Sequence, residues 1–148
     1  MRVFEVMTDG AHTVPPSMAA AVARDLMRRN KEHHLVVTKG SQVVGVISDR
    51  DVGGRGAVQA GDTVGDLMTT DVVTAQRTDT VRQAANRMRG RVIGCLPVLD
   101  GTRLVGIITI SDLLRMLGRG IDRPVAAERP SATHRVAHRK QRGKAGMW

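Results

Sequence analysis

The sequence predicts a mixed fold of the α/β (α+β) class, built from two copies of one small unit. Three observations support this prediction: an internal repeat, alternating helix and strand patterns within each copy, and enough apolar residues for a core. The chain has 148 residues, of which 41% are hydrophobic and 1% aromatic. The core is therefore expected to consist of aliphatic side chains.

The internal repeat is gapless. A shift of 61 residues aligns positions 7–52 with 68–113, and 13 of the 46 pairs are identical. They include the Met-Thr pair that begins each copy and the glycine and aspartate of "GVISDRD" (45–51) and "GIITISD" (106–112). This degree of self-similarity indicates a tandem duplication.

The first copy begins with the pattern of an amphipathic helix over 17–30, with Ser17 as its predicted N-cap. Two β-rich runs, 34–38 and 42–48, flank the glycine turn "KGS" and predict a hairpin. The apolar stripe of the helix is expected to contain Ala19, Val22, Ala23, Leu26 and Met27.

The second copy repeats this order. Thr78 is the predicted N-cap of its helix, and the runs 95–100 and 103–109 flank an Asp-Gly turn. A further helix is predicted from Asp112 to Leu117, where the organised part of the chain should end. The helical stripe here is expected to contain Val81, Ala84, Ala85 and Met88.

Each copy thus reads β-α-β-β-α and is too small to be stable alone, so the two repeats should pack together with pseudo-two-fold symmetry. The predicted domains are 1–57, 58–118 and a basic, disordered tail over 119–148. The tail carries eight Lys or Arg residues against two acidic residues, and so holds +6 of the net charge of +9.

The single cysteine, Cys95, indicates a reducing compartment, and no apolar run is long enough to cross a membrane. The start "MRVFEVMTDG" has no apolar core of a signal peptide. We therefore expect a cytoplasmic protein with no membrane partner.

The segments "VMTDGAHTV" and "HLVVTKGSQVVGVISDRDV", followed by "LMTTDVVTA" and "GCLPVLDGTRLVGIITISDLL", resemble the two halves of a cystathionine-β-synthase (CBS) domain pair, or Bateman module. The resemblance covers about residues 5–117. It implies a stand-alone regulatory module that binds adenosine-containing ligands in clefts between its halves and assembles as a homodimer.

The repeated seven-residue segment carries suitable chemistry in its own right. Val46, Ile47, Ile107 and Ile108 could form an apolar slot for a purine, and Gly45 and Gly106 leave room for a close approach to the strand. The hydroxyls of Ser48 and Thr109 lie beside predicted helix starts, which favour phosphate. Asp51 and Asp112 offer acceptor oxygens for a ribose diol.

In the family, the hydroxyl meets phosphate, the aspartate meets ribose and backbone near the first strand meets adenine. The resemblance therefore implies that nucleotide-binding residues are Thr13, Val14, Gly45, Val46, Ser48, Arg50, Asp51, Thr74, Ala75, Gly106, Ile107, Thr109 and Asp112.

A purely structural reading stays open, because an aspartate at a helix start is also a common N-cap. The copies also differ: Arg50 adds a cation that the second copy lacks, so a polyphosphate is expected at the Arg50 site if only one site takes it. Gly53, Gly54 and Gly56 weaken the helix predicted after Asp51.

The expected function is ligand sensing, with AMP, ADP or ATP as the ligand and S-adenosylmethionine or NAD as alternatives. No catalytic or metal cluster recurs, Cys95 is expected to be buried, and the pair His134 and His138 is attributed to chance, so no enzyme is predicted. An unidentified protein effector would receive the signal. Alternatively, the module is a dimeric scaffold whose tail, 119–148, binds nucleic acid or another polyanion.

Overall fold

The computed structural model describes residues 1–53 and 58–120. The chain divides into one unit over Met1–Leu114 and a second over Arg115–Trp148. The fold and the site belong to the first unit. Most of the predicted basic tail, including His134 and His138, lies outside the described residues, as do Gly54 and Gly56.

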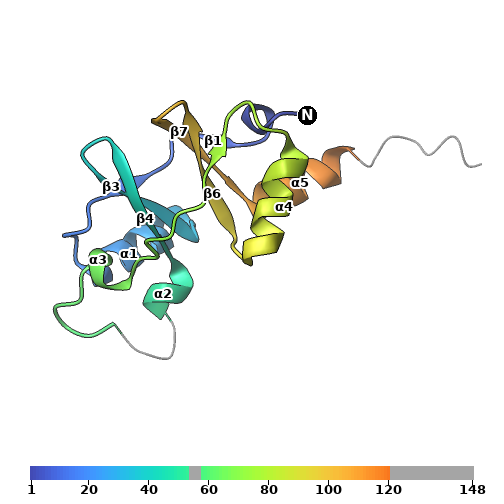
Figure 1. Ribbon diagram of the computed structural model, residues 1–148. Helices are drawn as coiled ribbons and strands as arrows, with labels where there is room; N and C mark the ends of the chain where they lie inside the picture. The colour runs from blue at the N-terminus through green and yellow to red at the C-terminus, as the bar shows by residue number, and fades with distance from the viewer. Residues whose placement is uncertain (54–57, 121–148) are drawn as a thin grey trace, which may run out of the picture. The chain divides into compact units, whose positions relative to one another are not determined.

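The elements follow the predicted order twice (Figure 1). In chain order they are η1 (Val3–Glu5), β1 (Thr8–Asp9), β2 (Thr13–Val14), α1 (Ala20–Asn30), β3 (His34–Lys39), β4 (Gln42–Ser48), α2 (Asp49–Gly53), α3 (Val64–Leu67), β5 (Ala75–Gln76), α4 (Val81–Arg91), β6 (Cys95–Asp100), β7 (Arg103–Thr109) and α5 (Ile110–Gly120).

Two sheets are present, one for each repeat. The order is β2-β3-β4 in one sheet and β1-β7-β6-β5 in the other. Each contains an antiparallel hairpin, and β2 and β5 run parallel to β3 and β6, respectively. Gly40 and Gly101 turn the hairpins with positive φ angles of 63° and 67°, which favour glycine. The predicted α/β class and the repeat are confirmed.

The start of each repeat and the residues just before it pack on the other repeat. β1 pairs with β7, and the buried Val3 belongs to the core of the second repeat. In turn, Val64 packs in the core of the first repeat, and Thr69 pairs with Val46 of β4. Because the exchange is reciprocal, each core is completed only by a segment from elsewhere in the chain.

The two cores are aliphatic, as expected. Ala23 and Met27 of α1 and Ala84 and Met88 of α4 are buried at matching positions. Val22, by contrast, was predicted on the buried stripe but is 53% exposed. The buried face of α1 is therefore narrower than the sequence pattern indicates.

Both predicted N-caps of these helices are wrong by two residues. The cap of α1 is Ala19, not Ser17, because the Met18 N–H bonds to the Pro15 carbonyl and a turn occupies the residues before the helix. The cap of α4 is Thr80, not Thr78; its hydroxyl accepts from the Gln83 N–H in a capping box.

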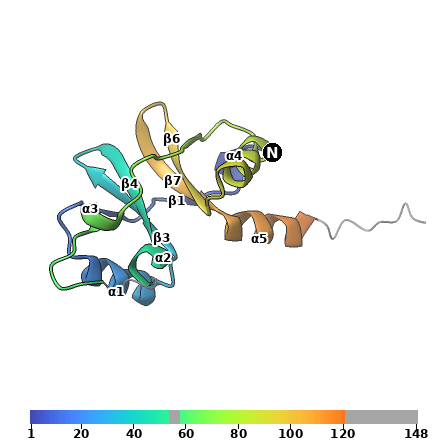
Figure 2. The same ribbon diagram turned by 60° about the horizontal axis from the view of Figure 1, so that its bottom comes forward.

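The last helix of each repeat follows its hairpin directly. α2 is described over Asp49–Gly53 and α5 over Ile110–Gly120. The described residues of the α2 segment end at Gly53. Figure 2 shows α1 and α2 side by side in the first repeat. Among the described residues, none of the helices combines the length and the apolar character needed to cross a bilayer.

Candidate ligand-binding cavity

A cavity of about 800 Å³ opens within the unit Met1–Leu114, and both repeats contribute to it. The first repeat supplies the end of β4 and the start of α2, whereas the second supplies its leading segment, α4 and the starts of β6 and α5. The lining residues are His34, Val46, Ser48, Asp49, Arg50, Asp51, Thr69, Asp71, Val72, Val73, Ala85, Met88, Arg89, Val92, Ile93, Gly94, Cys95, Ile110 and Leu113.

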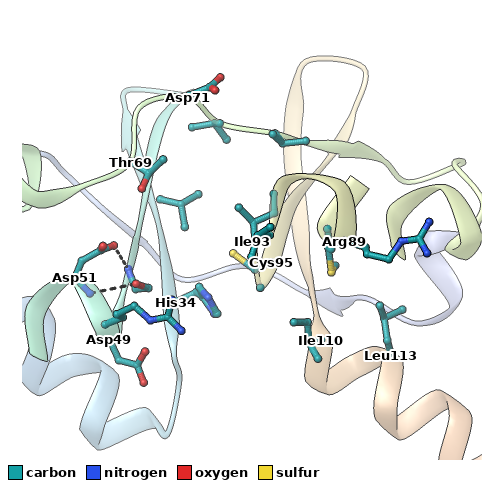
Figure 3. Close-up of a pocket in the computed structure, with 18 of the residues that line it drawn as sticks. His34, Asp49, Asp51, Thr69, Asp71, Arg89, Ile93, Cys95, Ile110 and Leu113 are labelled. Atoms are coloured by element: carbon teal, nitrogen blue, oxygen red, sulfur yellow. Dashed lines mark hydrogen bonds between the residues drawn. The ribbon is translucent and has the colours of Figure 1, made fainter. Parts of the chain in front are cut away.

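The Ser48–Asp51 turn forms the polar end of the cavity (Figure 3). Asp51 Oδ2 accepts the Ser48 N–H at 2.8 Å, and Ser48 Oγ accepts the Asp51 N–H at 3.2 Å. These reciprocal bonds are an N-terminal capping box, so the structural role of the pair is real. Within the described part of the chain, no donor bonds to Asp51 Oδ1, which leaves that oxygen for a ligand hydroxyl.

The segment Met68–Thr69 passes close to Gly45 and leaves no room for a side chain there. A Cβ placed on Gly45 would lie 2.5 Å from Met68 Sδ and 3.0 Å from the Thr69 carbonyl oxygen. Val46 exchanges two backbone hydrogen bonds with Thr69, at 3.1 and 2.9 Å. The group that approaches Gly45 closely is therefore the segment Met68–Thr69 and not a ligand. Because the backbone of Val46 is paired with Thr69, only the side chain of Val46 is left to contact a ligand.

The opposite wall of the cavity is apolar. Figure 3 shows Ile93, Ile110 and Leu113 across the cavity from Asp51 and Asp49. Val72, Val73, Ala85 and Met88 complete this wall. A cavity with an apolar wall and a few polar groups at one end suits a flat heterocycle joined to a polar group.

Two of the lining residues, Arg50 and Arg89, are cationic. Two of the cavity's three carboxylates have basic partners elsewhere: Asp49 bonds to His33 Nδ1 at 2.8 Å, and Asp71 bonds to Arg91. Asp51 is thus the carboxylate of the lining without an ionic partner among the described residues, and both arginines are available to an anionic group.

His34 and Cys95 occupy the same position in the two repeats and both line the cavity. Burial lowers the pKa of His34, and the nearby Asp49 only partly offsets this effect, so the imidazole is neutral near pH 7. Burial raises the pKa of the Cys95 thiol to about 12. Such a thiol is a poor nucleophile, which supports its prediction as a buried packing residue.

The counterpart of the Ser48–Asp51 turn is more enclosed. Asp112 is 4% exposed, and its Oδ2 accepts the Thr109 N–H at 2.9 Å and the Thr109 hydroxyl at 3.1 Å. Its Oδ1 accepts the Thr8 hydroxyl at 3.3 Å. Gly106 is again a site of close approach, because a Cβ there would lie 2.5 Å from the Thr8 carbonyl oxygen.

The structure therefore gathers four of the predicted binding residues in the cavity: Val46, Ser48, Arg50 and Asp51. Val14 and Ala75 are buried, and the Thr74 carbonyl accepts a hydrogen bond from Arg87 at 3.3 Å. The predicted residues that do not line this cavity are Thr13, Val14, Gly45, Thr74, Ala75, Gly106, Ile107, Thr109 and Asp112.

Sequence reasoning missed the contribution of α4 and the residues that follow it. Ala85 and Met88 were assigned only to a core stripe, and neither Arg89 nor Ile93 was singled out. One part of the apolar wall did have a sequence signal, because the apolar residues Val72 and Val73 directly precede the expected first strand of the second repeat. No local pattern, however, shows that these residues face the end of β4.

The comparisons with known proteins agree with the repeat. The family model described as CBS domain matches residues 3–52 and 64–119. The chain belongs to the CBS domain family. The CBS domain-containing protein YhcV of Bacillus subtilis is 29% identical over 114 residues, which are 75% of this chain and 81% of YhcV.

Other curated relatives are much longer than this chain. Homoserine O-acetyltransferase of Methanohalobium evestigatum is 28% identical over 117 residues, and the match covers 78% of this chain but only 24% of the enzyme. This chain spans about a quarter of the length of that relative.

Solved CBS structures share the fold. The CBS domain pair of protein MJ0100, in complex with 5′-methylthioadenosine and S-adenosyl-L-methionine, is 26% identical with a TM-score of 0.73, covering 80% of this chain and 96% of that one. CBSX2 in complex with AMP is 26% identical with a TM-score of 0.68 over the same shares of the two chains. CBS relatives of this chain therefore bind adenosine-containing compounds.

Residues 1–53 and 58–120 contain no group of three or more His, Cys, Asp or Glu side chains that could hold a metal ion.

Proposed function

We propose that this chain is a ligand-sensing module that takes an adenosine-containing compound into the cavity beside Asp51. The observation that carries this proposal is the pairing, in one cavity, of the Ser48–Asp51 turn with an apolar wall from the other repeat. The complexes of MJ0100 and CBSX2 support the same ligand class.

The proposed binding mode follows from the polarity of the cavity. The purine packs against Met88 and Ile93, where its apolar faces lose little hydration. The ribose hydroxyls donate to Asp51 Oδ1, and the Ser48 hydroxyl and Arg50 contact the 5′ substituent. Because the capping box holds Asp51 in place, the acceptor is preorganised before the ligand arrives.

The 5′ substituent is proposed to be phosphate, as in AMP, ADP or ATP. Arg50 and Arg89 line the cavity, and guanidinium groups bind phosphate strongly. S-Adenosylmethionine carries a sulfonium and an ammonium group beside its one carboxylate, so it offers these arginines less negative charge than a phosphate does.

We further propose a non-catalytic homodimer in the cytoplasm that signals to a protein effector. Val92 is 91% exposed and Leu114 is 62% exposed, and both are candidates for burial by a second copy. Light scattering after gel filtration, with and without AMP, tests the assembly; a monomer in both conditions contradicts this part of the proposal.

Calorimetric titration with AMP, ADP, ATP, S-adenosylmethionine and NAD tests the ligand class. We expect binding of at least one adenine nucleotide, lost in Asp51→Asn and weakened in Arg50→Gln. Mass spectrometry of small molecules released from the purified protein provides an independent readout. The absence of binding by every compound would refute the sensor proposal.

A second candidate function rests on the charge of 119–148, which holds +6 of the net +9. In that case this segment binds a nucleic acid or another polyanion and the CBS pair only dimerises. Replacing Arg139, Lys140 and Arg142 by glutamine in the full chain separates the candidates. Salt-sensitive RNA or DNA binding that falls in this variant favours the second, whereas unchanged nucleotide binding favours the first.

A further inference from the structure

The 61-residue repeat allows the cavity wall to be compared with the same positions in the other copy. The apolar character of the wall is only partly repeated there, because four of its seven residues have polar counterparts. These counterparts are His12 for Val73, Arg24 for Ala85, Glu32 for Ile93 and Asp49 for Ile110.

His12 and Glu32 contact each other, and Arg24 and Glu32 each leave a polar atom buried. His12 Nδ1 lies 2.6 Å from Glu32 Oε1. Arg24 Nε and Glu32 Oε2 are buried and have no hydrogen-bond partner in the described structure. A purine face placed against His12 and Glu32, whose side chains are 56% and 32% exposed, would remove these polar groups from water, which costs free energy. The apolar wall at Asp51 has no such cost.

The two aspartates reinforce this difference. Asp112 is buried, and both of its carboxylate oxygens accept hydrogen bonds from Thr8 or Thr109. A ribose diol at Asp112 would have to displace the Thr8 hydroxyl, whereas at Asp51 it meets Oδ1 directly.

We propose that each chain holds one adenosine compound, in the cavity at Asp51, and that His12, Arg24 and Glu32 exclude a second from the counterpart position. This inference rests on the proposed function and adds its stoichiometry and the residues that set it. The duplication has therefore produced one nucleoside site and one polar cluster rather than two equivalent sites.

The number of sites is measured by calorimetry and native mass spectrometry on the full chain, with AMP and 5′-methylthioadenosine as probes. We expect one molecule per chain at saturation. Two molecules per chain would overturn the inference while leaving the proposed function intact. Binding of neither probe would overturn the proposed function and this inference with it.

The location of the site is measured without any variant by photolabelling the native chain with 2-azidoadenosine 5′-monophosphate. Label is expected on peptides that contain residues 85–95 or 110–113, and excess AMP should suppress it. Competed label on 11–32 instead would overturn the assignment of the polar cluster as the excluding element.

Discussion

The Ser48–Asp51 and Thr109–Asp112 turns share one sequence pattern and one capping geometry, but they face different surroundings. At Asp51, one carboxylate oxygen faces a cavity whose far wall is apolar. At Asp112, the carboxylate is 4% exposed and Thr8 contributes a further hydrogen bond. The comparison shows that the pattern itself specifies a helix cap, and that the facing repeat decides whether the cap also serves a ligand.

The largest expected effect is the slow alkylation of Cys95, the counterpart of His34, because burial suppresses ionisation of its thiol. With a pKa of about 12, Cys95 is thiolate in only about one molecule in ten thousand at pH 8. Alkylation by iodoacetamide at pH 8 should therefore be about a thousand-fold slower in the native protein than in urea, as measured by mass spectrometry. Equal rates would contradict the burial of this thiol.

The glycines before the two turns should differ in their tolerance of a methyl group. Gly106→Ala places Cβ against the Thr8 carbonyl of β1, which is fixed backbone, and should cost about 3 kcal/mol of the free energy of unfolding. Gly45→Ala meets the flexible Met68 side chain first and should cost about 1 kcal/mol. Urea denaturation measures both, and the reverse order would refute the comparison.

The aspartates should show a smaller difference in the same direction. Asp51→Ala removes a helix cap and should cost about 1 kcal/mol. Asp112→Ala also leaves the Thr8 hydroxyl without its acceptor and should cost about 2 kcal/mol. Thermal unfolding in the absence of ligand checks this prediction; greater destabilisation by Asp51→Ala would show that Asp112 is not the more integrated residue.

The smallest effect is the pH dependence contributed by His34. Burial lowers the pKa of His34, so the unfolded chain binds this proton more readily than the folded chain. Stability is therefore lost as the pH falls below about 6.5 towards the lower folded pKa. His34→Leu should reduce the loss of unfolding free energy between pH 7 and pH 5, and an unchanged pH dependence would contradict this origin.

Local patterns were sufficient to predict the repeat and the two hairpins. Alternating β-branched residues around Gly40 and Gly101 specify a hairpin wherever it packs. The packing of each leading segment on the other repeat could not be predicted in this way, because no local sequence pattern near Thr8 or Thr69 indicates which sheet the residue pairs with. The start of α1 was misplaced because Ser17 is a better N-cap residue than Ala19, whose side chain makes no cap hydrogen bond. The start of α4 was misplaced because the capping box of Thr80 and Gln83 lies only two residues beyond Thr78, which is also a good N-cap residue.

Only part of the candidate site could be predicted from the sequence. Ser48 and Asp51 are close in the sequence, and their pattern can be read directly. Arg89 and Ile93 lie about forty residues further along and reach the cavity only through the packing of the two repeats. The polar cluster of His12, Arg24 and Glu32 is recognised only when the residues that line the cavity are compared with their counterparts 61 positions earlier.

The most direct test of this account compares two matched variants, Asp51→Asn and Asp112→Asn, in calorimetric titrations with AMP. Each replaces one carboxylate oxygen by an amide at equivalent positions of the repeats. The account predicts a loss of affinity of about 100-fold for Asp51→Asn and at most about 3-fold for Asp112→Asn, given that both variants are folded by circular dichroism. Equal losses, or a larger loss for Asp112→Asn, would contradict it.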